Sequence, residues 1–105
     1  MLKSLDCFNM KFRGVELAIN RIIVGDTVLI ENGEVTIIFD KDGNAHEMQV
    51  DSVKQYLFTD AHGNDVYEGD YIGYVDDENC VAWTAYYGDN YCPERLELRR
   101  ANYEY

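Results

Sequence analysis

Residues 66–75, with the sequence VYEGDYIGYV, decide how the rest of the chain is read. Gly69-Asp70 predicts a tight turn, because glycine reaches positive φ at little cost and an aspartate side chain can accept a hydrogen bond from its own turn. The chain then enters a predicted strand at Tyr71. We therefore interpret Glu68 and Asp70 as turn residues, with the Asp70 side chain capping its own backbone, rather than as a catalytic or metal-binding pair.

The same order of residues occurs earlier in the chain, at Gly25-Asp26. In both places the Gly-Asp pair precedes an apolar strand pattern, a polar loop and a second strand pattern. This repetition predicts two equivalent hairpins. Short strands with turn residues at intervals of roughly 8 to 12 positions are typical of all-β domains. The sequence therefore predicts a mostly β fold, either a small antiparallel barrel or two packed sheets of SH3-like hairpins, with at most one or two short helical turns.

Alternation of apolar and polar residues, together with β-branched residues, places the expected strands. They cover residues 10–14, 15–24, 27–30, 35–39, 46–50, 71–75, 80–86 and 95–102. Segment 15–24 also fits a short helix, and strand is the preferred interpretation. Asn32-Gly33 predicts a type I′ hairpin turn, since both residues adopt positive φ readily. Further turns are expected at 40–44 and 60–64, and a short helical turn is compatible with 51–53 and with Pro93.

The totals predict one domain spanning residues 1–105, and they limit its partners. The 20 acidic and 9 basic residues give a net charge of −11, which makes nucleic acid and anionic membranes poor partners. Three widely spaced cysteines and two histidines suggest no zinc site, disulfide framework or cofactor. No signal peptide is recognised, and no apolar run approaches the roughly 20 residues of a membrane helix. The expected location is therefore the cytoplasm, with reduced thiols.

Three segments of the chain together resemble the YopX-like family of small phage and prophage proteins. They are MKFRG at 10–14, VDSVKQY at 50–56 and VYEGDYI at 66–72. The Thr-Gly pair usual in that family is replaced here by Leu57-Phe58, and its Lys-Asn-Gly turn reads AHGN at 61–64. The resemblance implies a small, mainly β protein encoded by a phage or prophage and acting in the host cytoplasm. Because the family has no settled biochemical activity, the resemblance implies no catalytic residue.

Other patterns that suggest chemistry have simpler structural interpretations. Residues 40–44 begin like a calcium-binding loop, but the glycine comes too early and no glutamate occupies the twelfth position, so a hairpin turn is preferred. His46 and His62 lie in or beside predicted turns. Cys80 and Cys92 are expected to be small apolar residues, because no histidine is near to lower a thiol pKa. An enzyme is therefore not expected.

The strongest functional signal is compositional and covers residues 55–93. This stretch contains no lysine or arginine, eight acidic residues and seven of the nine tyrosines. Tyrosine offers a large contact area at small entropic cost and is enriched in protein interfaces. Two interpretations remain open: the tyrosines form a binding surface, or they build the core with their hydroxyls at its edge. The candidate partner-binding residues are Asp70, Tyr71, Tyr74, Asp76, Asp77, Glu78, Tyr86, Tyr87, Asp89 and Tyr91.

These observations predict a non-enzymatic binding protein that engages a host or phage protein with a basic surface. A narrower form of the hypothesis is an anti-defence inhibitor, of the anti-CRISPR or anti-restriction type, whose carboxylates mimic nucleic acid. The alternative is a structural protein that self-assembles into a homo-oligomer through exposed strand edges and tyrosines.

Overall fold

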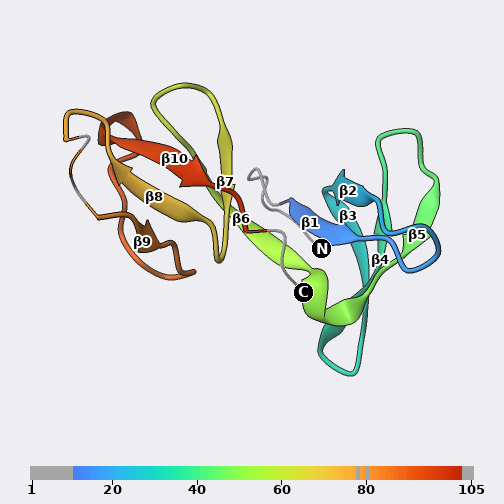
Figure 1. Cartoon of the computed structure of the whole chain (residues 1–105). Helices are drawn as coiled ribbons and strands as arrows, with labels where there is room; N and C mark the ends of the chain where they lie inside the picture. The colour runs from blue at the N-terminus through green and yellow to red at the C-terminus, as the bar shows by residue number, and fades with distance from the viewer. Residues whose placement is uncertain (1–10, 78, 80, 103–105) are drawn as a thin grey trace. The chain divides into compact units, whose positions relative to one another are not determined.

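The computed structural model describes residues 11–77, 79 and 81–102, and the chain divides into two compact units. Unit 1 extends to Gln55 and unit 2 begins at Tyr56. Within the described residues the chain is mostly β, as predicted, with two single 3₁₀ turns (Figure 1). The strands form three antiparallel sheets and, in this part of the chain, no closed barrel. The barrel alternative is therefore wrong, and each unit consists of strands packed over a core of its own.

Unit 1 contains two small sheets. β1 (Phe12–Val15) pairs with β2 (Ile22–Gly25) and with Lys54 and Gln55 at the start of β6 (Lys54–Thr59). The other sheet is a meander of β3 (Thr27–Glu31), β4 (Glu34–Phe39) and β5 (Ala45–Glu47), followed by the 3₁₀ turn η2 (Val50–Ser52). Ile23, Ile38 and Met48 form the buried core between these elements. Removing such side chains from water is the main stabilising contribution.

Unit 2 is built in a similar way. The rest of β6 pairs with β7 (Asp65–Tyr67), and β8 (Tyr71–Tyr74) lies between β9 (Trp83–Thr84) and β10 (Leu96–Arg100). The 3₁₀ turn η3 (Pro93–Arg95) leads into β10. The core consists of one residue from each of β6, β7, β8 and β10 and one that follows β9: Phe58, Val66, Ile72, Leu96 and Ala85. As the repeated Gly-Asp pairs predict, β3–β4 and β8–β9 are both antiparallel pairs that begin directly after a Gly-Asp pair. Gly69 lies in a turn, whereas Gly25 is the last residue of β2.

Local predictions differ from the structure mainly between residues 14 and 21. Gly14 does not end a strand but lies inside β1, where an added Cβ would stand 2.9 Å from the Met48 sulfur. The predicted strand 15–24 is interrupted by a turn, which Asn20 closes with a φ of 56°. The N–H of Asn20 donates to the Glu16 carbonyl at 3.0 Å. β-branched residues on both sides concealed this turn, because propensity is a weak guide where hydrogen bonds decide the path. Met10, the predicted start of the first strand, lies outside the described residues.

Other turns agree with the prediction. Asn32 and Gly33 have φ values of 53° and 80°, as a type I′ hairpin requires. The strand predicted at 80–86 is shorter in the structure, with only Trp83–Thr84 paired, and Cys80 lies outside the described residues. In the described part of the chain, no helix has the length and apolar character needed to cross a membrane.

Candidate functional site

Asp70, in the middle of residues 66–75, is a structural residue. Its side chain is fully buried, and its two carboxylate oxygens accept hydrogen bonds from the backbone N–H groups of Tyr67 at 2.9 Å and Asn102 at 2.8 Å. The predicted capping role is confirmed by the bond from Tyr67. The prediction that Asp70 belongs to a binding surface is wrong, because a fully buried carboxylate cannot contact a partner.

The tyrosines divide between core and surface, so each of the two interpretations describes some of them. Tyr67 is buried, and Tyr56, Tyr71 and Tyr91 are half-buried. Tyr74, Tyr86 and Tyr87 are exposed, with 40%, 57% and 64% of their surface accessible.

Exposed carboxylates occur in the same two loops as these tyrosines. Asp76 and Asp77 follow β8, and Asp89 follows Tyr86 and Tyr87. Glu78 lies outside the described residues. We refer to the exposed set as the tyrosine face of unit 2, which consists of Tyr74, Asp76, Asp77, Tyr86, Tyr87 and Asp89.

Internal hydrogen bonds hold the second of these loops. The Tyr91 hydroxyl accepts from the Tyr86 N–H at 2.9 Å and lies 3.0 Å from an Asp89 carboxylate oxygen. Burial raises the pKa of Tyr91, and the Asp89 carboxylate adds to this effect, so the hydroxyl keeps its proton. The Tyr91 ring packs against Phe58, with 4.9 Å between ring centroids. Tyr91 therefore supports the loop that presents Tyr86 and Tyr87.

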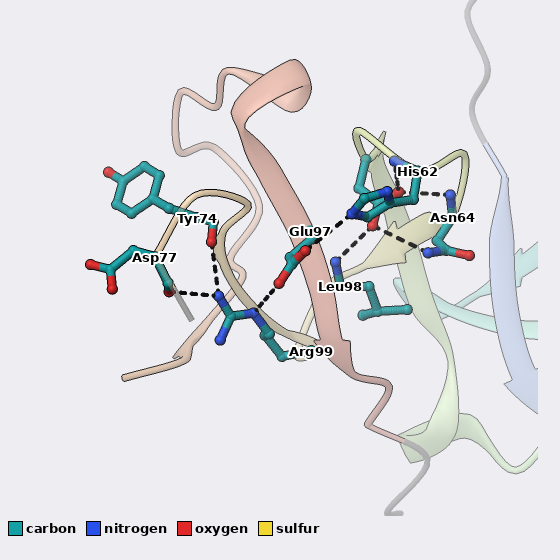
Figure 2. A network of polar contacts seen from close by, with 8 residues as sticks. His62, Asn64, Tyr74, Asp77, Glu97, Leu98 and Arg99 are labelled. Atoms are coloured by element: carbon teal, nitrogen blue, oxygen red, sulfur yellow. Dashed lines mark hydrogen bonds and ion pairs between the residues drawn. The ribbon is translucent and has the colours of Figure 1, made fainter. Parts of the chain in front are cut away.

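Arginines from β10 lie beside the acidic stretch, which the linear charge pattern did not indicate. Arg99 donates from Nη2 to the carbonyl oxygens of Tyr74 at 2.8 Å and Asp77 at 3.0 Å, and its Nε lies 2.7 Å from a Glu97 carboxylate oxygen (Figure 2). Arg99 reaches these carbonyls across Gly73, where an added Cβ would stand 2.7 Å from the guanidinium carbon. The loop after β8 is thus held from β10, and its local charge is partly balanced.

Two further arginines stack on predicted site residues. Arg100 lies over the Tyr71 ring, 4.7 Å from its centroid, and Arg95 lies over the Tyr74 ring at 5.7 Å. The positive charge of an arginine is attracted to the electron-rich face of an aromatic ring. The acidic stretch between residues 55 and 93 is therefore not an unbroken acidic surface in the folded unit.

A pocket of about 400 Å³ opens next to the tyrosine face. We refer to it as the aromatic pocket, and it is lined by Tyr74, Trp83, Asp89, Asn90, Tyr91, Cys92, Arg95 and Leu96. Its volume falls within the range of pockets that bind small molecules or peptide side chains. Tyr74 and Asp89 belong to both the tyrosine face and the pocket, so the two form one continuous region of unit 2.

Two turns of the chain share one five-residue pattern of hydrogen bonds. In residues 40–44 and 60–64, the first aspartate accepts from the N–H groups two and four residues later through Oδ1, at 2.8 to 2.9 Å. The predicted turns are confirmed, and the calcium-loop pattern at 40–44 is an aspartate turn. In the second turn, Oδ2 of Asp60 also accepts from the Leu98 N–H at 2.7 Å, the contact drawn beside His62 in Figure 2. Burial acts to raise the pKa of Asp60, but the N–H donors outweigh it and the pKa is lowered.

In unit 1, Oδ2 of Asp40 instead contacts a buried histidine. His46 lies between two carboxylates, with Nε2 2.8 Å from Asp40 Oδ2 and Nδ1 2.7 Å from Glu16 Oε2. Hydrogen bonds to Asp40 and Glu16 raise the pKa of His46, while the bond from His46 lowers the pKa of Glu16 and lowers that of Asp40 to about 2. Two ionised carboxylates can each accept a hydrogen bond from the ring only if both ring nitrogens carry hydrogen, so the imidazolium form fits this site.

This cluster predicts that unit 1 is most stable between about pH 4.5 and 6.5. The raised pKa of His46 stabilises the folded state. This stabilisation is complete below the ordinary histidine pKa of 6.5, and it is lost as pH rises through the pKa that His46 has in the folded chain. The lowered pKa values of Asp40 and Glu16 also stabilise the folded state. This stabilisation is complete above the ordinary pKa values, 3.8 for Asp40 and 4.5 for Glu16, and it is lost as pH falls through the folded values, which for Asp40 is about 2.

Thermal unfolding across this pH range, followed for the wild-type chain and His46→Gln, measures the effect. The wild type should lose stability above pH 6.5, and His46→Gln should not show that decline, because glutamine does not titrate. A decline of equal steepness in the variant would show that other groups cause it.

The sequence did not reveal this cluster, and only part of it was accessible to sequence analysis. Asp40 and His46 lie on either side of a predicted turn, so the sequence could have predicted that they lie close together. Glu16 lies 30 positions before His46 and reaches it through the isolated bridge between Glu16 and Met48. Among the described residues, no group of three or more potential ligands is placed to hold a metal ion. The Cys92 thiol is free and exposed, which differs from its expected role as a buried apolar residue.

Compared with models of protein families, with curated proteins and with solved structures, the chain matches none. The resemblance to the YopX-like family therefore stays a prediction made from residues 10–14, 50–56 and 66–72. The class that the fold and the site define is a small, mostly β protein with an exposed face rich in tyrosine and aspartate.

Proposed function

We propose that this chain is a non-enzymatic protein-binding module that acts through the tyrosine face of unit 2. The observation that carries the proposal is the exposure of Tyr74 at the end of β8 and of Tyr86 and Tyr87 in the loop after β9, where internal hydrogen bonds hold the backbone. An exposed tyrosine on a rigid loop loses little entropy on binding, which is why such residues dominate many recognition surfaces. The carboxylates between them favour a partner with a basic surface.

The narrower form of the proposal is a phage-encoded anti-defence inhibitor that mimics nucleic acid. The net charge of −11 and the resemblance to phage proteins support it. Three arginines that contact residues of β8 weaken this narrower form: Arg95, Arg99 and Arg100. Mimicry of a phosphate backbone requires a continuous track of negative charge, and these arginines interrupt it. The structure therefore supports a basic protein partner more strongly than this narrower form.

The test is capture of partners from bacterial lysate at low and high salt. We compare the wild type with Asp76→Lys/Asp77→Lys and with Tyr86→Ser/Tyr87→Ser, because these residues are exposed on the tyrosine face. Glu34→Lys/Asp42→Lys is the control, since it makes the same charge change at exposed positions of unit 1.

We expect a partner that is captured at low salt, is weakened at high salt by screening, and is lost in both face variants. Capture that survives both face variants, or that is lost equally in the unit 1 control, would contradict the proposal.

Self-association is a second candidate, and a feature of unit 1 favours it. Among residues 11–77, 79 and 81–102, β2 and β3 are edge strands in their sheets, and one side of each has no paired strand. Six large aliphatic side chains on and near them are 42% to 62% exposed: Leu17, Ile19, Ile22, Val24, Leu29 and Ile30. Exposed edges with apolar residues favour pairing between chains. Light scattering at micromolar concentration decides this point, since a strict monomer excludes it.

A further inference from the structure

The aromatic pocket has rigid walls. The rings of Tyr74 and Trp83 lie 5.2 Å apart at an interplanar angle of 53°, and Arg95 stacks on Tyr74. The Tyr91 ring is held by Phe58 from one side and by its hydroxyl contacts at the other end. Leu96, which is buried, also contributes to the lining. A ligand would therefore meet two preformed aromatic surfaces rather than mobile side chains.

The polar groups that line the pocket include several hydrogen-bond donors. Within the described part of the chain, the Trp83 indole N–H, the Asn90 amide and the Tyr74 hydroxyl have no hydrogen-bond partner, and Arg95 has no carboxylate partner. One oxygen of the Asp89 carboxylate accepts from the Tyr91 hydroxyl. A ligand that supplies acceptors and flat apolar surfaces fits the donors and rings of this lining.

We infer that the aromatic pocket binds a proline-rich peptide segment in the polyproline II conformation, with a lysine or arginine next to it. Proline has no N–H, and the carbonyl groups of a polyproline II segment make no internal hydrogen bonds, so its backbone offers acceptors. Proline rings pack against aromatic side chains, and the extended segment is ordered before it binds, which lowers the entropic cost. These properties complement the donors and rings of the pocket.

Charge supports a basic residue beside the prolines. Asp76 and Asp77 come two and three residues after Tyr74, and the Asp77 N–H donates to the Tyr74 carbonyl, so this acidic loop turns back on the residue that forms one pocket wall. Asp89 lines the pocket together with Arg95, so the lining itself carries one charge of each sign. A small anion is the competing occupant, since Arg95 could bind it, and the Asp89 carboxylate in the same lining disfavours it.

This inference rests on the proposed function and names the chemistry of the partner. Its test uses the intrinsic fluorescence of Trp83, the only tryptophan of the chain, so no label is required. The probe is a short peptide of proline and leucine with an arginine at each end. The control peptide has every proline replaced by alanine and keeps both arginines.

We expect a saturable change in Trp83 fluorescence with the proline peptide, at a Kd in the micromolar range, and binding at least tenfold weaker with the alanine peptide. Tyr74→Ala and Asn90→Ala should each weaken binding severalfold to tenfold. Asn79→Ala is the matched control for Asn90→Ala, because Asn79 is also exposed and lies outside both the pocket lining and the tyrosine face. Amide spectra of each variant establish that unit 2 remains folded.

Three results would overturn the inference. The first is no saturable change up to about 1 mM peptide, a concentration at which even weak recognition is seen. The second is equal binding of the two peptides, which would mean attraction by charge alone. The third is displacement of the proline peptide by inorganic phosphate or adenosine monophosphate at equal ionic strength, which would identify the pocket as an anion site.

The peptide experiment and the lysate experiment can fail separately. If the peptide does not bind while a captured partner still depends on Asp76, Asp77, Tyr86 and Tyr87, the inference fails and the proposed function stands. If the peptide binds the pocket while no partner depends on those four residues, the proposed tyrosine face fails.

Discussion

Replacing Asp70 with alanine is expected to unfold unit 2 at a much lower temperature. The change removes the acceptor of two backbone N–H groups, those of Tyr67 and Asn102, and leaves a cavity in a fully buried position. Each buried donor without a partner costs about 1 to 3 kcal/mol, so a total near 3 kcal/mol is expected. For a unit of this size the unfolding midpoint should fall by more than about 10 °C.

Thermal unfolding and amide hydrogen exchange measure this effect, and exchange also locates it. The amides of Tyr67 and Asn102 should lose protection first. Asp76→Ala is the control, since it removes a carboxylate from an exposed position of the same unit and should change stability by less than about 0.5 kcal/mol. Equal midpoints for the two variants would show that the buried carboxylate contributes no more than a surface charge.

Replacing Gly25 with alanine is expected to destabilise unit 1 by about 3 kcal/mol, in the upper part of the range for overpacking. An added Cβ would stand 2.2 Å from the Phe39 carbonyl oxygen and 2.7 Å from Cγ2 of Ile38, the central buried residue of this core. The first neighbour is backbone of β4, which cannot move without disturbing its pairing with β3. The strands would have to separate locally to accept a single methyl group.

Urea unfolding of Gly25→Ala measures this cost, with two variants for comparison. Asp26→Ala changes an exposed residue whose carboxylate accepts a hydrogen bond from the Thr27 hydroxyl, and it should be nearly neutral. Gly33→Ala places a methyl group in open space at a φ of 80°, so it should cost only the conformational strain of about 1 to 2 kcal/mol. If Gly25→Ala were no worse than Gly33→Ala, close packing at Gly25 would not be its function.

The two Gly-Asp pairs therefore have the same sequence and different physical roles. At residues 25 and 26 the glycine is essential, because β4 approaches its backbone closely, and the aspartate is exposed. At residues 69 and 70 the aspartate is essential, because it is buried among backbone donors, while Gly69 serves the turn with a φ of 92°. The equivalence that the sequence predicted holds for the order of the strands and not for the contribution of each residue.

The tyrosine face was only partly predictable. The concentration of tyrosine and acid between residues 55 and 93 was visible in the sequence, and Tyr74, Tyr86, Tyr87, Asp76, Asp77 and Asp89 are exposed as the binding hypothesis requires. The same pattern also included Asp70, which is buried, and Tyr91, which supports a loop. Exposure depends on what packs above a residue, and local sequence does not contain that information.

By itself, the sequence determined the mostly β class and most turns of this protein. Strand alternation and residues such as Asn32-Gly33 act through local backbone preferences, which each short segment carries within itself. Only the tertiary structure decided which charges meet. Antiparallel pairing of β10 with β8 brings Arg99 to the carbonyls of Tyr74 and Asp77, 25 and 22 positions away. Folding likewise places Glu16 against His46 across 30 positions. Such contacts arise from strand pairing between distant segments, so packing and not composition decided which residues of the tyrosine face are exposed.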